Sequence, residues 1–293
     1  MISVKKLLVS LVTIAALAGC KSPKRDDYVV AKSLNKDDVI EQSEFKFYLD
    51  TSAPVEIRGE YSHDRSIDGS QVMYYGTPGA ALVQVFSHAA INSSLKEQKL
   101  KEQQEEANRY IKPLIEASKQ VTHVTLTQGM SDYLVRQLPV AGDKTVHVRP
   151  IFFSNQDMNK LSLKLIAWIE KPKSSKTKSR KKLNNLMYQN IIEVHGSTWG
   201  DELATQLMEG QADISEQYEA LFVRAVDSLK KDLSGTYVQT PPQQTLHIKK
   251  KNNKQFLRAS VIEQSCEYVV IKNLRNWILH YPASYVTNIQ NQC

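Results

Sequence analysis

Two stretches of sequence decide the fold of this chain. Residues 161–170 read LSLKLIAWIE, and residues 186–195 read LMYQNIIEVH. Short runs rich in branched and aromatic side chains favour β-strands. The residues between them, 171–185, read KPKSSKTKSRKKLNN, which is typical of a solvent-exposed turn. We therefore predict an antiparallel hairpin with a basic loop at its tip.

Shorter strand patterns precede this hairpin. Phe45, Phe47 and Leu49 alternate with more polar residues, which is the period of a half-buried strand. Pro150 lies inside another such segment and indicates a sheet edge or a bend, because proline lacks the amide hydrogen that a central strand donates. The strands predicted in this part of the chain are residues 44–50, 55–61, 72–75, 121–126, 133–140 and 145–153.

One long helix is predicted among these strands, over Gly79–Lys119. Its first part is apolar on most sides, and its second part is highly charged. The loop Gly76-Thr77-Pro78-Gly79 can present backbone amides to an anion, but the lysine and hydroxyl residue of a phosphate-binding loop do not follow it. We expect a turn that starts the helix there, and we expect Pro113 to interrupt the helix.

A second helix is predicted over Trp199–Leu233. Its apolar residues recur at intervals of three and four, so one face should pack on the sheet. Ser197 or Thr198 is the expected N-terminal cap, and Gly235 is the expected stop. Gly210 marks a weak point in this helix or a close contact.

The C-terminal residues 236–293 predict several short strands, which are residues 245–250, 255–264, 267–272 and 276–281. Such spacing is typical of a small SH3-like barrel or of a meander. Four aromatic residues would line a peptide or glycan groove or form the core. The core is favoured because a unit this small needs its large apolar groups for burial. These four are Tyr268, Trp277, Tyr281 and Tyr285.

The predicted fold class is α+β, with an antiparallel sheet, two long helices and a small all-β C-terminal subdomain. Residues 1–19 would form a signal segment, and residues 20–43, which are polar and without a period, a flexible tether. A coil of that length reaches roughly 25 Å on average. Residues 44–235 would form the α+β domain, and residues 236–293 the β subdomain.

The first twenty residues show a pattern of their own. Lys5 and Lys6 precede the run Leu7–Ala18, in which only Ser10 and Thr13 are polar. This run is too short to span a bilayer, which needs about 20 apolar residues. A basic start, a short apolar run and small residues before a cleavage point are typical of a secretory signal peptide.

The segment ends in Leu17-Ala18-Gly19-Cys20, which resembles the lipobox of bacterial lipoproteins. The resemblance implies cleavage between Gly19 and Cys20, a diacylglycerol on the Cys20 thiol and an acyl chain on the new amino group. Two or three acyl chains hold a protein on a membrane essentially permanently. Lys21 rather than aspartate follows the cysteine, which in this family implies the outer membrane. The alternative is an ordinary secretory signal whose cleavage site contains a cysteine.

The chain has three cysteines. If Cys20 carries lipid, Cys266 and Cys293 remain, and an oxidising compartment favours a disulfide between them. Such a bond closes a loop of about 27 residues and contributes about 3 kcal/mol. The alternatives are two unpaired thiols, or a Cys293 that reacts between molecules.

Composition and charge predict a water-soluble body on a lipid anchor. The net charge is +7, hydrophobic residues make up 41% of the chain, and no second apolar run reaches membrane length. Seven basic residues in the hairpin loop form a candidate anion-binding site, and the alternative is a solvated loop tip. For a secreted protein we expect lipid head groups, anionic glycans or an envelope protein as partners, and no nucleic acid. The seven residues are Lys171, Lys173, Lys176, Lys178, Arg180, Lys181 and Lys182.

The sequence motifs do not predict catalysis. The seven histidines lack the spacing that would place two metal ligands on one face, and no nucleophile elbow, paired-carboxylate signature or CxxC pair is present. We expect no metal and no cofactor besides the lipid on Cys20. The function predicted is a periplasm-facing outer-membrane lipoprotein with a non-catalytic binding or scaffolding domain for a cell-envelope partner. The alternatives are an envelope or cell-wall hydrolase with a dispersed site, and a surface-exposed lipoprotein.

Overall fold

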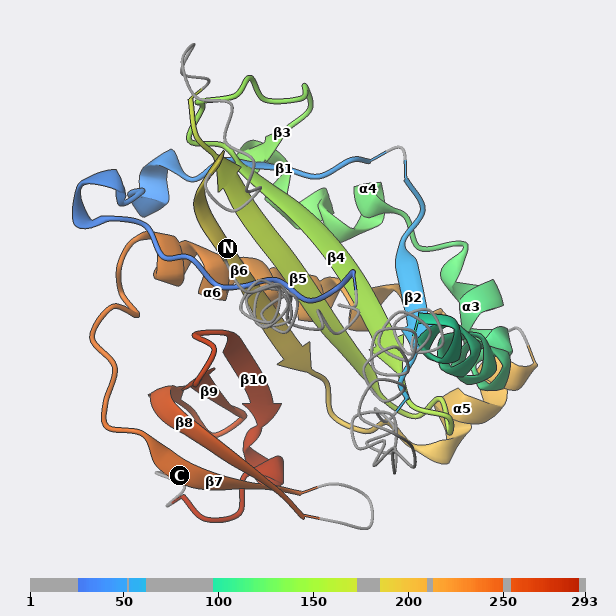
Figure 1. Ribbon diagram of the computed structural model, residues 1–293. Helices are drawn as coiled ribbons and strands as arrows, with labels where there is room; N and C mark the ends of the chain where they lie inside the picture. Colours follow the sequence, from blue (N-terminus) through green and yellow to red (C-terminus); the bar gives the residue numbers. More distant parts are fainter. Residues whose placement is uncertain are drawn as a thin grey trace, which may run out of the picture. The chain divides into compact units, whose positions relative to one another are not determined.

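The structure is a computed structural model of the 293-residue chain. It describes residues 26–51, 53–61, 97–172, 185–209, 213–249 and 254–289. The chain forms two compact units, residues 1–28 with 61–105, and residues 29–60 with 106–293. The second unit contains the sheet (Figure 1).

Ten strands of the described residues form one sheet. Nine lie in the order β3-β1-β4-β5-β6-β10-β9-β8-β7, and β2 also pairs with β4. Strands that follow one another from β4 to β6 and from β7 to β10 pair antiparallel, so the predicted antiparallel character is confirmed for most of the sheet. The pairs β1–β3, β1–β4, β2–β4 and β6–β10 are parallel. The strands are β1 (Phe47–Tyr48), β2 (Glu56–Gly59), β3 (Leu134–Val135), β4 (Val146–Ser154), β5 (Leu161–Glu170), β6 (Leu186–His195), β7 (Gln244–Lys249), β8 (Lys254–Gln264), β9 (Tyr268–Asn273) and β10 (Ile278–Pro282).

The predicted central hairpin is present as β5 and β6. The two strands pair from Ser162 opposite His195 to Glu170 opposite Leu186. Its flanking strand β4 contains Pro150, which lies between the residues that pair with β1 and those that pair with β2. The missing amide hydrogen of Pro150 therefore falls where neither strand needs it, in agreement with the predicted edge or bend.

The predicted second helix is two helices instead of one. They are α5 (Asp201–Met208) and α6 (Ser215–Leu233). α6 contacts β5 and β6, and Figure 1 shows it crossing behind these strands. Its buried residues repeat at intervals of three and four, and Phe222 and Leu229 have no exposed surface. The predicted packing of an amphipathic helix on one face of the sheet is confirmed for α6.

One glycine lies at the start of α5 and another follows the end of α6. Gly200 is the N-cap of α5 and no side chain caps that helix, so the predicted cap at Ser197 or Thr198 is wrong. Gly235 follows α6 with a φ of 78°, which is the left-handed conformation that glycine adopts without strain. The predicted stop is therefore confirmed. Gly210 lies outside the described residues.

Residues 121–126, which we predicted as a strand, contain the short helix α4 (His123–Leu126) instead. Thr122 is its N-cap, and the Thr122 hydroxyl accepts a hydrogen bond of 3.2 Å from the backbone N–H of Thr125. This local bond offers the backbone a helical turn despite the β-branched residues around it. The neighbouring prediction for residues 133–140 is too long, because β3 covers only two of them.

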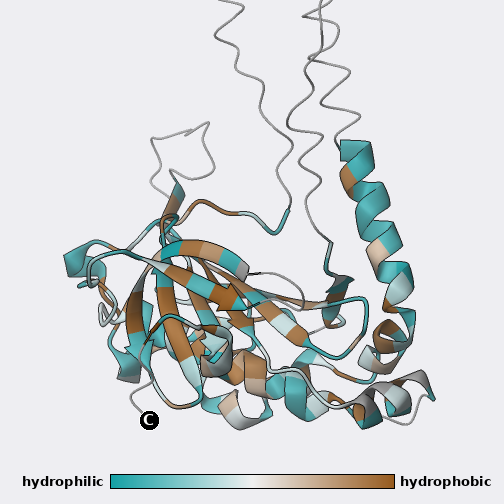
Figure 2. Cartoon of the chain, turned by 90° about the horizontal axis from the view of Figure 1, so that it is seen from below, coloured by the Kyte–Doolittle hydropathy of each residue, from teal (hydrophilic) through white to brown (hydrophobic). Residues whose placement is uncertain are grey.

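The first long helix is described only from residue 97 onward. Residues 97–110 are helical and mostly hydrophilic (Figure 2). Ile111 leaves helical geometry with φ −98° and ψ 18°, and α3 (Lys112–Ser118) then begins with Pro113 in its first turn. The predicted interruption at Pro113 is confirmed, since proline is tolerated in the first turn of a helix but not in its interior.

The C-terminal strands β7 to β10 form a meander in chain order, one of the two predicted forms. Because β10 pairs with β6, the meander continues the sheet of the central hairpin. After β10 the 3-10 helix η6 (Ala283–Tyr285) leads to Val286, which forms a single bridge with Ile248 of β7. Trp277 and Tyr281 are buried, as predicted for core residues. The other two predicted core aromatics, Tyr268 and Tyr285, are half-buried.

The part of the predicted tether from residue 29 onward packs on the sheet. Lys32 and Gln189 of β6 exchange two backbone hydrogen bonds of 2.7 and 2.9 Å. The Val29 carbonyl accepts a bond of 3.1 Å from the Trp277 indole, and Ile40 is only 2% exposed. These contacts correct the predicted extent of the tether, because the body begins by Val29 rather than at residue 44.

Candidate functional site

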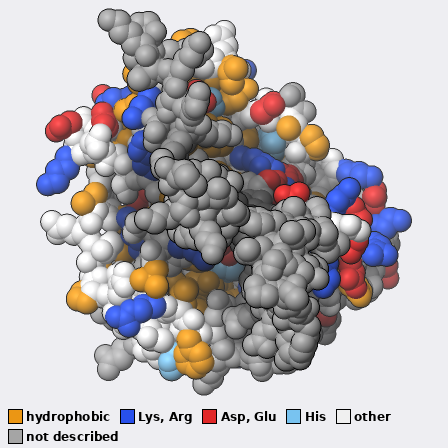
Figure 3. Space-filling model, in the orientation of Figure 1, with side chains coloured by type: hydrophobic (Ala, Val, Ile, Leu, Met, Phe, Trp, Pro, Cys, Tyr) orange, Lys and Arg blue, Asp and Glu red, His pale blue; other side chains and the backbone are white. Residues whose placement is uncertain are grey.

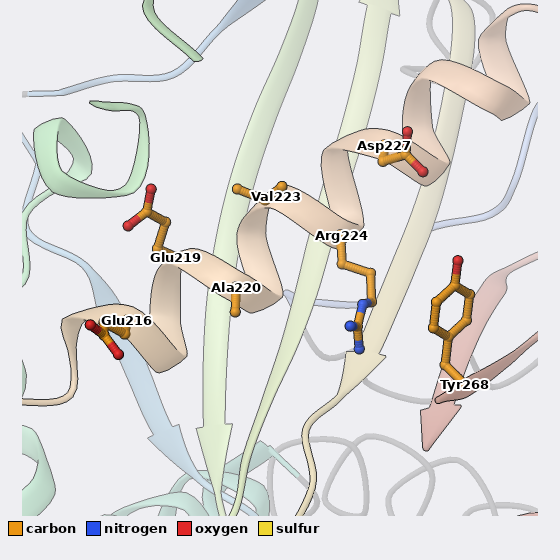
Figure 4. A pocket seen from close by; sticks show the side chains of 7 residues that line it. All are labelled: Glu216, Glu219, Ala220, Val223, Arg224, Asp227 and Tyr268. Atoms are coloured by element: carbon orange, nitrogen blue, oxygen red, sulfur yellow. The ribbon is translucent and has the colours of Figure 1, made fainter. Parts of the chain in front are cut away.

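An open depression of about 510 Å³ runs along α6. Its lining residues recur about one turn apart, so one helix supplies nearly the whole strip. Figure 4 shows Arg224 reaching from α6 toward Tyr268, which comes from β9. The lining residues are Glu216, Glu219, Ala220, Val223, Arg224, Asp227 and Tyr268.

The depression is acidic with an apolar centre. Three carboxylates line it against one arginine, and Val223 between them is 40% exposed. The Arg224 guanidinium lies 4.9 Å from the centre of the Tyr268 ring, a cation–π contact, and 3.8 Å from Glu267. Asp227 lies 3.0 Å from Lys231, one turn further along the helix. The lining residues therefore carry more negative than positive charge.

A charged cluster beside this strip ties α6 to the C-terminal strands. The Glu263 carboxylate of β8 accepts two bonds of 3.0 Å from Lys231, one of 2.7 Å from the Tyr237 hydroxyl and one of 3.0 Å from the Tyr268 hydroxyl. Burial opposes the charged form of Glu263, but these hydrogen bonds outweigh it and lower the pKa of the carboxyl group. Tyr268 thus belongs both to the depression and to the cluster that positions it.

A serine of α6 and a histidine of β10 meet on the buried side of the helix. The Ser228 Oγ lies 2.6 Å from Nε2 of His280 in β10, the spacing of a nucleophile and its base. Ser228 is 1% exposed and His280 is 2% exposed, and neither lines the depression. Burial, with Arg224 as the next cause, lowers the pKa of His280 to about 3, so its imidazole is neutral. Ser228 and His280 therefore form a hydrogen bond within the core.

Strand β6 carries a close contact between a glutamate and a histidine. Oε1 of Glu193 is 3.0 Å from Nε2 of His195, and the His195 ring stacks on Tyr281 at 4.4 Å with an angle of 12°. Burial alone would raise the pKa of Glu193. His195, Lys164 and Lys160 outweigh that effect, and the pKa falls to about 2.

Most of the site residues predicted from the sequence lie outside the described residues. These are Gly19, Cys20, Cys293 and six members of the basic loop, Lys173, Lys176, Lys178, Arg180, Lys181 and Lys182. Lys171 is described and exposed, and Cys266 is disulfide-bonded. Neither lies in the depression or the charged cluster. The excess of acidic residues over 199–235 is visible in the sequence. The 32-residue separation of Lys231 from Glu263 gave no signal for their pairing.

Comparisons with known proteins do not assign the chain to a family. No family model, no curated protein and no solved structure matches it. Across the described ranges no group of three or more His, Cys, Asp or Glu side chains could hold a metal ion. Within the same ranges no helix is long and apolar enough to cross a membrane.

Proposed function

We propose that this chain is an outer-membrane lipoprotein, anchored through acylated Cys20, whose periplasm-facing body binds or scaffolds an envelope protein. Support for the anchor comes from the lipobox-like sequence Leu17-Ala18-Gly19-Cys20 and the basic and apolar residues before it. The observation that carries the binding role is the acidic, open depression along α6. The proposed partner presents a basic segment to it.

The form of the depression favours a macromolecular partner. It follows one exposed helix face, with Val223 at its centre and carboxylates of Glu216 and Asp227 at either end. Small-molecule sites are usually concave and apolar and enclose most of their ligand. A charged strip on a helix instead steers and aligns a partner of opposite charge.

The test places a photo-crosslinking amino acid at Val223 in growing cells. We expect one discrete crosslinked protein, and we expect the double variant Glu216→Lys, Glu219→Lys to weaken that crosslink. A crosslinker at Val124, which is 63% exposed on α4, is the matched control. The proposal fails if Val223 and Val124 give the same crosslinks, or if charge reversal leaves the Val223 crosslink unchanged.

The anchor has a separate test. Mass spectrometry of the mature protein should find an N-terminal Cys20 with a diacylglycerol and an acyl chain, and Cys20→Ser should move the chain to the soluble fraction. An unmodified N-terminus would contradict the anchor without touching the depression. Protease treatment of intact cells distinguishes the periplasm-facing body from the surface-exposed alternative.

The same proposal includes an SH3-like C-terminal subdomain and a disulfide between Cys266 and Cys293. The bridge between Val286 and Ile248 supports an SH3-like closure of β7 to β10, because the chain returns to the first strand after η6. Cys293 is the proposed partner of the disulfide-bonded Cys266. Peptide mapping without reduction should find the 266–293 crosslink, and a peptide that joins Cys266 to Cys20 would contradict both this bond and the anchor.

An envelope hydrolase is the second candidate, and the contact between Ser228 and His280 is the observation that favours it. A serine-directed fluorophosphonate probe separates the two functions. The scaffold proposal expects an unlabelled protein, because both residues are buried. Labelling that disappears in Ser228→Ala would favour the hydrolase.

A further inference from the structure

The loop between β3 and β4 exposes two aliphatic side chains. Val140 is 75% exposed and Leu138 is 70% exposed, the largest values among the big apolar side chains of the described residues. The two residues stand two positions apart, so in extended backbone they point to the same side. In Figure 3 hydrophobic side chains reach the surface at the upper edge, where Figure 1 draws β3 and this loop.

A tight turn fixes how Val140 is presented. The Asp143 N–H donates to the Val140 carbonyl at 3.1 Å, and the Val140 N–H donates to the Asp143 carboxylate at 3.2 Å. Gly142 has a φ of 109°, which suits the third position of such a turn. Reciprocal bonds of this kind order the loop before any partner arrives, so little conformational entropy is lost on binding.

This loop packs beside the end of the central hairpin. A Cβ built on Gly142 would lie 3.1 Å from Cα of Pro172, just after β5. Arg136, Lys144 and Lys171 are exposed around this point. In residues 132–144 and 164–172 the acidic residues are Asp132, Asp143, whose carboxylate is used in the turn, and Glu170.

We propose that this end of the sheet docks on an anionic lipid bilayer. Leu138 and Val140 enter the interface, and Arg136, Lys144 and Lys171 face the head groups. Aliphatic side chains surrounded by basic residues bind such an interface through apolar burial and electrostatic attraction together. If this surface bound a protein instead of a bilayer, that protein would have to present acidic residues. The test below includes that outcome.

The short stretch of chain between Cys20 and Val29 also supports docking on the bilayer. This step rests on the lipid anchor proposed above. Cys20 stands nine residues before Val29, where the chain joins the sheet. Nine residues span at most about 30 Å. A body held within that distance meets the bilayer at a high effective concentration, so weak docking by the loop suffices.

The test uses the full chain purified from membranes and reconstituted into vesicles. Val140→Cys and, as the control, Phe256→Cys each carry an environment-sensitive fluorophore, and the labelled parent chain gives the background. Phe256 is 65% exposed on β8, near the opposite edge of the sheet. The vesicles contain phosphatidylcholine alone or a mixture with phosphatidylglycerol.

We expect the label at position 140 to shift to the blue and brighten severalfold on the anionic vesicles only, while the label at 256 stays unchanged. Arg136→Glu and Lys144→Glu should each weaken docking by about fivefold or more. Three results would overturn the proposal. They are an equal response at both positions, no response at 140, and a response at 140 only when an envelope protein is added. Flotation with uncharged vesicles reports the anchor separately, so its failure is distinguishable from failure of docking.

Discussion

The Glu263 carboxylate is a single residue that joins three parts of the molecule. It accepts hydrogen bonds from Lys231 of α6, Tyr237 of the following loop and Tyr268 of β9. Glu263→Gln keeps the shape of the side chain but removes its charge. Because hydrogen bonds to charged groups contribute about 1.5–3 kcal/mol, we expect a loss of about 2 kcal/mol in the free energy of unfolding, measured by urea denaturation.

The matched control is Glu267→Gln in the turn that follows β8. The Glu267 side chain is 80% exposed, and its Oε2 lies 3.8 Å from a guanidinium nitrogen of Arg224. Exposed ion pairs contribute about 0–1 kcal/mol, so this change should be nearly neutral. Equal losses for the two variants would show that the Glu263 cluster does not stabilise the fold.

Glu193 makes the stability of the protein depend on pH. Its pKa falls from 4.5 to about 2 in the folded state, so the unfolded state binds the proton more tightly. The stabilisation is therefore complete above pH 4.5 and is lost as the pH falls toward 2. From the size of this shift we expect a loss of roughly 3 kcal/mol across that window.

The variant Glu193→Gln should flatten the dependence of unfolding free energy on pH in this window, because the amide does not titrate. Glu170→Gln, at the exposed end of β5, is the control and should follow the parent chain. Urea denaturation at several pH values measures both. The assignment is wrong if Glu193→Gln retains the full slope.

At the scale of elements, the end of α6 depends on Gly235. Its φ of 78° is unfavourable for any residue with a Cβ atom. Gly235→Ala should therefore cost about 1 kcal/mol of unfolding free energy, seen as a lower thermal midpoint. Gly129→Ala is the control, because its added Cβ would meet its nearest neighbour at 3.7 Å and its φ is not positive. If both variants melted alike, backbone strain at Gly235 would not be the cause.

Elements with a strong local pattern were predictable, and those set by one local bond were not. The β5–β6 hairpin and α6 have periods that match their burial, so the sequence alone indicated them. Residues 121–126 carry β-branched side chains, yet the Thr122 cap makes them helical. The pairing of Lys32 with Gln189 joins residues 157 apart, and no pattern within residues 29–43 indicates it.

At the scale of the whole molecule, the candidate surfaces were only partly predictable. The basic loop and the excess of acidic residues over 199–235 are visible as composition, because charge is a local property of sequence. The exposure of Leu138 and Val140 is not, since residues 133–140 were predicted to form a strand. Burial of Ser228 with His280, and the four bonds to Glu263, depend on how β8 and β10 are placed beside α6.

The parallel pairing of β10 with β6 decides whether the C-terminal meander unfolds on its own. Ile278 of β10 lies opposite Ile192 of β6, has no exposed surface and belongs to the same hydrophobic cluster as α6. Because this contact is central and not at a linker, we expect one cooperative transition. Ile278→Ala should remove about 2–5 kcal/mol, and hydrogen exchange should accelerate equally in β5, β6, β8 and β9.

Leu274→Ala is the control, because Leu274 is 62% exposed in the turn before β10 and its truncation should leave exchange unchanged. Faster exchange confined to β7–β10 in Ile278→Ala would instead support the boundary predicted at residue 235. The two outcomes also bear on function. In a meander that is cooperative with the hairpin, the Glu263 cluster and β6 open together, whereas an independent meander leaves the depression along α6 with a movable wall at Tyr268.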